Sequence, residues 1–88
     1  MIKFKSDLTH DFIKDLKKIK FNFGLQKRLG NKIEEIIENP NHYKPLRNVL
    51  KNRRRAHIGN YVLIFEINER DKAIIFHSFR HHDEAYKQ

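Results

Sequence analysis

Two short stretches of the 88-residue sequence carry side chains that can bind and cleave a phosphodiester. In a strand, alternation places Arg53, Arg55 and His57 on one face, with about 6.5–7 Å between successive members. Such a row suits contacts to a run of phosphates. The second stretch is Arg80-His81-His82-Asp83, and Tyr86 follows shortly after it. Brought together, the two stretches would form a small basic site.

This inventory matches what RNA cleavage by the ribose 2′-OH needs. The reaction requires a base for the 2′-OH proton, an acid for the leaving 5′-oxygen and cations beside the phosphorane-like transition state. Histidine can serve in either proton role. We expect Tyr61 to lie near His57 across a hairpin, and the two stretches to converge if the last strand lies beside the strand that bears Tyr61. The arginines by themselves support binding, not catalysis.

Other readings of these residues compete with catalysis. The run His81-His82-Asp83 could bind a metal, but only one or two of its side chains can share a direction, and no second ligand pair stands at helical or hairpin spacing. We therefore expect no metal and no cofactor. Tyr61 and Tyr86 fit sheet packing as well as base stacking. The chain has no cysteine, so no disulfide is expected and a cytoplasmic location is the default.

The charge of the chain indicates a polyanionic partner. Nineteen Lys and Arg against eleven Asp and Glu give a net charge of +8, which favours nucleic acid first and an anionic membrane second. The longest stretch without Asp, Glu, Lys or Arg runs from Ala56 to Phe65, too short to span a bilayer, so no membrane-spanning segment is expected, and a membrane is not among the expected partners. The excess is densest in one segment that contains no acidic residue and holds Lys44, Arg47, Lys51, Arg53, Arg54 and Arg55.

The first half of the chain predicts a strand and two helices. Residues 2–5 alternate as a strand, and Ser6-Asp7 would form a turn that caps a helix from Leu8 to about Lys20. After a break at 21–24, a second apolar stripe predicts a helix that stops at Asn39-Pro40, because proline cannot continue a helix. The two stripes consist of Leu8, Phe12, Leu16 and Ile19, and of Leu25, Leu29, Ile33, Ile36 and Ile37.

The second half predicts three strands after a loop at 39–52. The strands cover 53–58, 61–67 and 72–79, and Gly59-Asn60 forms a tight hairpin turn between the first two. Because two cores would each be too small to fold alone, residues 1–88 form a single domain. The predicted class is α+β: a helical hairpin packed on a four-stranded, mostly antiparallel sheet in the order β-α-α-β-β-β. The other face of the sheet, or its edge, is left free to bind.

Three segments, taken in this order, resemble the RelE/ParE superfamily of type II toxins over nearly the whole chain. They are Leu46-Arg47, then Arg55-x-His57-Ile58-Gly59-Asn60-Tyr61-x-Leu63-Ile64-Phe65-Glu66-Ile67, then Phe79-Arg80-His81-His82-Asp83-Glu84-Ala85-Tyr86. The closing His-His-Asp-x-x-Tyr is the most specific and is similar to the histidine-bearing, YafQ-like branch. The resemblance implies a RelE-like fold and a ribosome-dependent endoribonuclease, an mRNA interferase that blocks translation. It also implies a RelB-like antitoxin that neutralises the toxin, typically in a heterotetrameric complex.

The resemblance also assigns roles to single residues. His57 and His82 match the catalytic histidines, Arg80 matches an arginine that stabilises the transition state, and Arg53 and Arg55 approximate the basic residues of the strand. Tyr61 and Tyr86 stand where the family has aromatic residues, and Asn60 stands where it has an acidic one. Val62 departs from the family, because many members have arginine there; this removes one phosphate contact.

The sequence thus supports a hypothesis with two alternatives. The first alternative is a ParE-like inhibitor of DNA gyrase on the same scaffold, and the second is an RNA-binding module without chemistry. A histidine-rich C-terminus favours the nuclease over both. In the nuclease, the expected catalytic residues are His57, His82, Arg80, Arg55 and Tyr86, and the expected substrate-binding residues are Tyr61, Asn60, Arg53, Arg54, Lys51 and Lys44. The expected partners are the antitoxin, the ribosome and mRNA.

Overall fold

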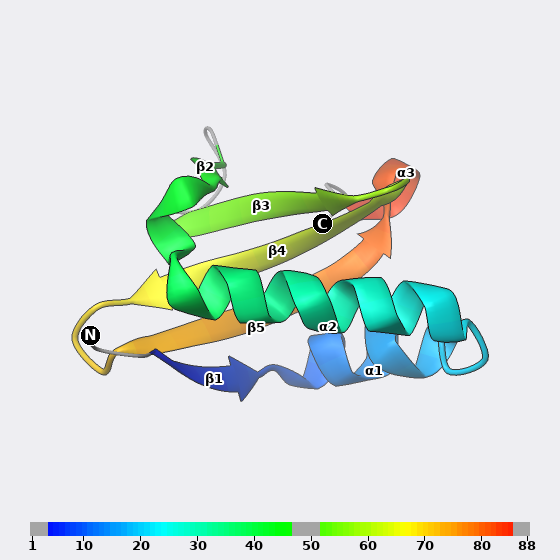
Figure 1. Ribbon diagram of the computed structural model, residues 1–88, viewed down its shortest axis with the longest axis horizontal. Helices are drawn as coiled ribbons and strands as arrows, with labels where there is room; N and C mark the ends of the chain where they lie inside the picture. The colour runs from blue at the N-terminus through cyan, green and yellow to red at the C-terminus, as the bar shows by residue number, and fades with distance from the viewer. Residues whose placement is uncertain (1–3, 47–51, 86–88) are drawn as a thin grey trace.

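Five strands form one sheet in the order β1-β5-β4-β3-β2, and the two longer helices pack on it (Figure 1). The computed structural model describes residues 4–46 and 52–85. Its elements are β1 (Lys5–Leu8), α1 (His10–Lys18), α2 (Phe23–Glu38), the 3₁₀ helix η1 (Pro40–His42), β2 (Lys44–Pro45), β3 (Arg53–Ile58), β4 (Tyr61–Asn68), β5 (Ala73–His81) and α3 (His82–Ala85). None of the described helices is long and apolar enough to cross a membrane.

The predicted α+β class is confirmed, with one strand more than expected. β1 pairs parallel with β5, and the other three strand pairs are antiparallel. The extra strand is the two-residue β2, which lies in the predicted loop and pairs with Arg54 and Arg55 of β3. Its second residue is Pro45, and proline is tolerated there because β2 is an edge strand.

The first strand and the first helix begin later than predicted. Only Lys5 of the predicted strand at 2–5 lies in β1, and residues 1–3 lie outside the described range. Ser6 and Asp7 continue β1 and do not form a turn. The cap of α1 is Thr9, whose hydroxyl accepts the Phe12 N–H at 3.1 Å. Pairing with β5 therefore outweighs the capping preference of Ser6 and Asp7, and Leu8 ends the strand.

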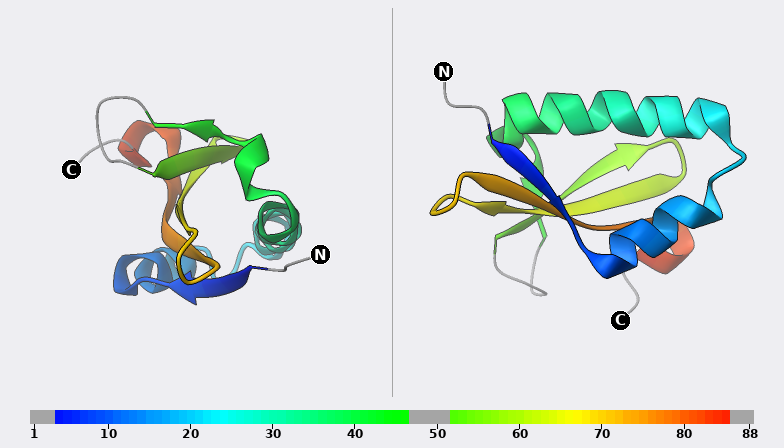
Figure 2. Two further views of the ribbon diagram at one scale, coloured as in Figure 1. Left: turned by 90° about the vertical axis from the view of Figure 1, so that its left-hand side faces the viewer. Right: turned by 90° about the horizontal axis from the view of Figure 1, so that it is seen from below.

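The helical hairpin is confirmed, with a shorter break than expected. α1 ends at Lys18, and α2 begins at Phe23, inside the predicted break, with the Asn22 side chain accepting the Leu25 N–H at 3.1 Å. α2 ends before Asn39-Pro40 as predicted. α1 contacts β5 and α2 contacts β3, so the hairpin extends across the sheet from β5 to β3. Figure 2 shows α2 and the short α3 on opposite sides of the sheet.

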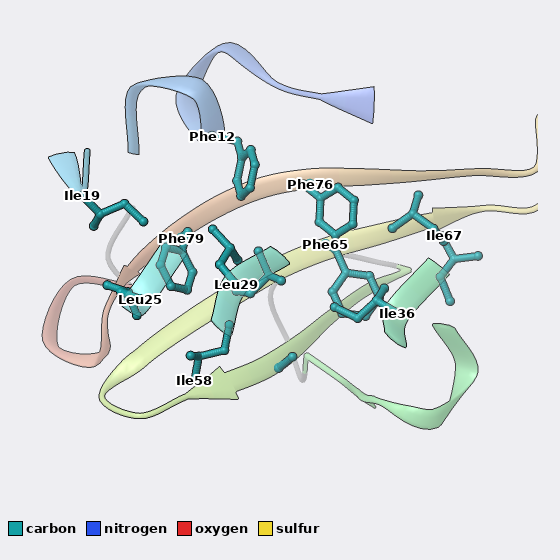
Figure 3. Packing of buried hydrophobic residues seen from close by; sticks show 13 residues of the cluster. Phe12, Ile19, Leu25, Leu29, Ile36, Ile58, Phe65, Ile67, Phe76 and Phe79 are labelled. Atoms are coloured by element: carbon teal, nitrogen blue, oxygen red, sulfur yellow. The ribbon is translucent and has the colours of Figure 1, made fainter. Parts of the chain in front are cut away.

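The main core lies between the helical hairpin and the sheet (Figure 3). Phe65 and Phe76 face this core, and between them and Phe79 the β4–β5 register shifts so that His77 is an extra residue on β5. This bulge lets Phe76 and Phe79, three residues apart, face the same core. A smaller cluster of Val62, Ile64 and Ala85 lies on the other face, so β4 is buried on both sides. The buried members of the main core include Phe12, Leu25, Leu29, Ile36, Ile58, Leu63, Phe65, Ile74, Phe76 and Phe79.

Phe65 is expected to be a major contributor to stability. Its ring is fully buried and lies 5.7 Å from the Tyr43 ring and 6.2 Å from the Phe76 ring. Phe65→Ala should lower the free energy of unfolding by about 3–5 kcal/mol, because it removes the ring and leaves a cavity. Urea denaturation measures the change, and Phe21→Ala, at an 80% exposed position, is a matched control with an expected change within about 0.5 kcal/mol. Equal losses in the two variants would contradict this account of the core.

Candidate functional site

The sheet face opposite the helical hairpin collects basic side chains in rows. His57 pairs with Val62, and Val62 pairs with Arg80, so His57 and Arg80 share one row. With strands about 4.8 Å apart, their backbones lie about 10 Å from each other. Arg55 stands in the next row, where it pairs with Lys44 of β2. We call this surface the basic face; its residues are Lys44, Arg53, Arg55, His57 and Arg80.

The alternation predicted for β3 is confirmed by its burial pattern. Ala56 and Ile58 are buried in the core beneath the helices, whereas Arg53 and Arg55 are half-buried and His57 is exposed on the opposite face. Strict period-two geometry accounts for this result, because six consecutive residues of β3 pair with β4 without a bulge. Arg53, Arg55 and His57 therefore follow one another at every second position of β3, and this period sets the spacing of their side chains.

A hydrogen bond fixes His82 beside the β3–β4 turn. Gly59 has a φ of +58°, which suits a two-residue hairpin turn, and Ile58 pairs directly with Tyr61 across it. The Asn60 carbonyl in this turn accepts the His82 N–H at 2.7 Å. The His82 side chain is 63% exposed, and its Nδ1 lies 3.8 Å from Asp83 Oδ1. The turn and the start of α3 thus form one unit that presents an imidazole to solvent at the end of the sheet.

Tyr61 lies on the other side of the sheet from His57, contrary to the sequence prediction. It pairs with Ile58 and His81, and its ring stacks on Phe79 at 5.0 Å and meets the His81 ring edge-on at 5.7 Å. Adjacent residues of a strand point to opposite faces, so pairing of His57 with Val62 separates it from Tyr61. The structure thus brings His81 beside Tyr61, a neighbour that sequence reasoning did not single out.

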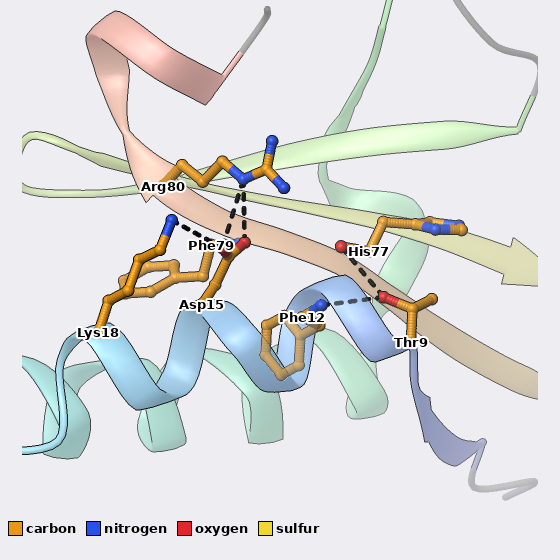
Figure 4. A network of polar contacts seen from close by, with 7 residues as sticks. All are labelled: Thr9, Phe12, Asp15, Lys18, His77, Phe79 and Arg80. Atoms are coloured by element: carbon orange, nitrogen blue, oxygen red, sulfur yellow. Dashed lines mark hydrogen bonds and ion pairs between the residues drawn. The ribbon is translucent and has the colours of Figure 1, made fainter. Parts of the chain in front are cut away.

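Arg80 is tied to α1 by a buried carboxylate (Figure 4). The Arg80 Nε lies 3.1 Å from Asp15 Oδ2 and 3.4 Å from Asp15 Oδ1. Asp15 is only 2% exposed and also accepts the Phe79 N–H at 3.0 Å. Beside Asp15 lies a cavity of about 100 Å³ whose lining includes Tyr61, Arg80, His81 and Glu84. Asp15 interrupts the apolar positions of α1 at Phe12, Leu16 and Ile19, and that interruption was the signal for it in the sequence.

Arg54 is separated from the basic face. It lies on the helix side of β3, and its Nη1 donates to the Tyr43 carbonyl at 2.6 Å, which fixes the chain where it enters β2. The Tyr43 hydroxyl donates to Glu35 at 3.4 Å, and burial, followed by the charge and hydrogen bond of Glu35, raises the pKa of Tyr43. Arg54 therefore helps to place Lys44 beside Arg55. The predicted site residues Lys51 and Tyr86 lie outside the described range.

Arg80, His82 and the β3–β4 turn meet at one end of the sheet, which we call the corner. Side chains in and near the corner can bind phosphate and transfer protons. Guanidinium groups of Arg55 and Arg80 can hold phosphate oxygens, and His57 and His82 carry exposed imidazoles. In residues 4–46 and 52–85, no group of three or more His, Asp or Glu side chains is arranged to hold a metal ion.

Comparison with known proteins places this fold among toxins. Residues 7–86 match the family model described as "ParE toxin of type II toxin-antitoxin system, parDE". A Methanocaldococcus jannaschii protein named "Putative toxin RelE4" is 46% identical over 63 residues, covering 70% of this chain and 67% of that protein. A Methanosarcina mazei protein is 34% identical over 86 residues, covering 97% of this chain and 96% of its own length.

Solved structures give the same grouping. The E. coli DinJ-YafQ toxin-antitoxin complex contains a chain that superposes with a TM-score of 0.80 at 20% identity, covering 97% of this chain and 99% of that one. The RelB-RelE antitoxin-toxin complex from Methanococcus jannaschii contains a chain with a TM-score of 0.68 at 29% identity, covering 91% and 94%. The overall fold is thus shared with a chain of each of these complexes.

Proposed function

The chain belongs to the RelE/ParE superfamily of type II toxins, and we propose that it is an mRNA interferase, an endoribonuclease that cleaves mRNA on the ribosome. The observation that carries the proposal is the corner where the basic face meets His82. There Arg80 and His57 share a row of the sheet, and the Asn60 carbonyl holds the start of α3 beside the same hairpin. Two exposed imidazoles near arginines on one face of the sheet favour the nuclease over a scaffold that only binds protein.

The proposed reaction is transesterification at one phosphate. A base removes the proton from the ribose 2′-OH, the 2′-oxygen forms a bond to phosphorus, and the bond from phosphorus to the 5′-oxygen breaks. An acid gives a proton to that 5′-oxygen, which leaves a 2′,3′-cyclic phosphate. His57 and His82 share these two proton roles, while Arg80 and Arg55 stabilise the charge on the phosphoryl oxygens. No metal or cofactor takes part in these steps.

The other predicted residues bind the substrate in this proposal. Tyr86 stacks or orients bases, since an aromatic ring is a platform for any base. The Tyr61 ring stacks on Phe79 on the other side of the sheet from His57, so Tyr61 contacts the substrate only at the end of the sheet, beside His81. Asn60 binds the substrate through its side chain in this proposal, and its backbone carbonyl also accepts the His82 N–H. Lys44, Arg53 and Lys51 hold phosphates of messenger or ribosomal RNA, and Arg54 supports them through its hydrogen bond to Tyr43.

The proposed protein partner is a RelB-like antitoxin. Two of the similar solved structures are toxin–antitoxin complexes, one with DinJ and one with RelB. A net charge of +8 calls for an acidic partner, and a long acidic segment that orders on binding can cover an exposed site. We expect a heterotetramer of two toxins and two antitoxins in the cytoplasm, with the basic face of each toxin covered.

Inhibition of DNA gyrase is the second candidate, because the matching family model is the one described for ParE of parDE. Primer extension on a messenger separates the two candidates. Ribosome-bound messenger should be cut in the presence of the protein, and naked messenger in a parallel lane should stay intact. A supercoiling assay with purified gyrase runs alongside. Intact messenger in both lanes, with ribosomes from a compatible source, together with blocked supercoiling, would replace the nuclease proposal by gyrase inhibition.

Arg55→Ala should weaken RNA binding in a salt-dependent way. Arg55 stands beside Lys44 in the middle of the basic face, and on a single strand each phosphate contact contributes about 0.7 to the slope of log K against log salt. Fluorescence anisotropy with a single-stranded RNA should show a slope that is smaller by that amount. Arg70→Ala is the matched control, because Arg70 is an exposed arginine in the β4–β5 turn at the opposite end of the sheet. An equal change in both variants would exclude a specific phosphate contact at Arg55.

A further inference from the structure

The outer edge of β5 is covered in two different ways along its length. β1 pairs with Ala73–Phe76 only, so the remainder of this edge has no strand beside it in the described sheet. There α1 supplies side chains in place of a strand. Thr9 Oγ1 donates to the His77 carbonyl at 3.1 Å, and Asp15 Oδ2 accepts the Phe79 N–H at 3.0 Å. An asparagine of the same shape would also accept the Phe79 N–H, so the edge alone does not explain why a carboxylate stands at 15.

A buried carboxylate is costly, and its cost here is offset by a specific partner. Asp15 is 2% exposed on a helix face that otherwise packs apolar side chains, and burial of a charge requires pairing and hydrogen bonds. The nearest cationic partner is the Arg80 Nε, at 3.1 Å and 3.4 Å from the two carboxylate oxygens. Lys18 Nζ lies farther away, at 3.9 Å, and the Lys18 side chain is 69% exposed.

The direction of this contact matters for Arg80. The carboxylate takes the Nε–H, and the two terminal amino groups of the guanidinium point away from Asp15 (Figure 4). Those two groups form the fork that binds phosphate oxygens in pairs. An arginine on a free edge samples many rotamers, whereas a carboxylate held by the fold restricts it to one presentation.

We infer that Asp15 is a positioning residue, which acts through the Arg80 Nε to aim the terminal amino groups of Arg80 at the scissile phosphate. This inference rests on the proposed nuclease function. The carboxylate of Asp15 also has an electrostatic cost for substrate binding, because its negative charge repels an incoming phosphate. Asp15 therefore exchanges some affinity for RNA against correct geometry in the transition state.

Asp15→Asn separates these two effects. The amide oxygen still accepts the Phe79 N–H, but the charge and the second acceptor for Arg80 are lost. We expect the turnover number on ribosome-bound messenger to fall by about 10- to 100-fold, while the affinity for RNA stays equal or rises. A loss of stability alone would lower the active fraction and would not raise affinity. Thr9→Val removes the hydrogen bond to the His77 carbonyl and the cap of α1 without touching Arg80. It is the matched control for lost stability and should keep its turnover per folded molecule.

A double-mutant cycle with Arg80→Ala decides whether Asp15 acts through Arg80. In the Arg80→Ala background, Asp15→Asn should have no further effect on turnover. If Asp15→Asn lowered turnover by the same factor in both backgrounds, Asp15 would support only the folded structure, and the inference would be overturned. A readout without activity is the ¹⁵Nε–¹H signal of Arg80, which should exchange with solvent faster in Asp15→Asn than in the wild type. If the wild type does not cut messenger, the nuclease proposal fails; the Arg80 signal then decides the positioning by itself, and an identical signal in both proteins overturns it.

Discussion

His82→Ala is expected to lower ribosome-dependent cleavage by about 10²–10⁴-fold, the usual contribution of a positioned acid or base. The expectation follows from where the imidazole lies. The His82 N–H donates to the Asn60 carbonyl, so its backbone is held at the end of the hairpin, and its side chain remains 63% exposed there. The variant keeps that backbone bond, and the fold should therefore persist. Primer extension with wild-type and variant protein on the same ribosome-bound messenger measures the loss.

Binding should survive this change, because the phosphate contacts come from other residues. Anisotropy with RNA is expected to give similar affinities for the wild type and His82→Ala. His10→Ala is the matched control, since His10 is an exposed histidine at the start of α1, and it should cut as the wild type does. A parallel loss of binding and cleavage in His82→Ala would remove His82 from the proton-transfer step and make it a binding residue.

Local patterns predicted the parts of the fold that depend on neighbours in the chain. The alternation of β3, the Gly59-Asn60 turn and the end of α2 before Pro40 are confirmed, because each is decided within a few residues. The predicted start of α1 was wrong because it depends on a contact with a distant part of the chain. Ser6 and Asp7 have good capping side chains, but the parallel partner of β1 lies more than sixty positions later in the sequence. No local signal carries that pairing.

The candidate site shows the same division. To predict that His57 and Arg80 share a row, one must know the register of three strands. To predict which face of the sheet Tyr61 lies on, one must know the register of the β3–β4 hairpin. The extra residue at His77 is set by packing of Phe76 and Phe79 on one core, so strict alternation along β5 would have misplaced side chains on one side of the bulge. Asp15 was visible only as an acid in an apolar stripe. Its partner on β5 became known from the tertiary structure.

Arg80→Ala is expected to reduce both cleavage and stability. Loss of one donor that stabilises transition-state charge costs about 10²–10³-fold in turnover. The variant also leaves the buried Asp15 carboxylate without its nearest cationic partner, which should lower the free energy of unfolding by about 1–3 kcal/mol. Lys18→Ala is the control for the same carboxylate. Its exposed amino group at 3.9 Å should contribute less than about 1 kcal/mol and nothing to turnover.

Adding Asp15→Asn to Arg80→Ala should separate the two losses. A neutral amide at position 15 needs no cation and can still accept the Phe79 N–H, so urea denaturation should show part of the lost stability restored. Turnover should stay at the level of Arg80→Ala, because the guanidinium that faces the phosphate is still missing. Recovery of cleavage together with stability would mean that Arg80 serves the fold alone. In that case the positive charge for the transition state would have to come from Arg55 and its neighbours on the basic face.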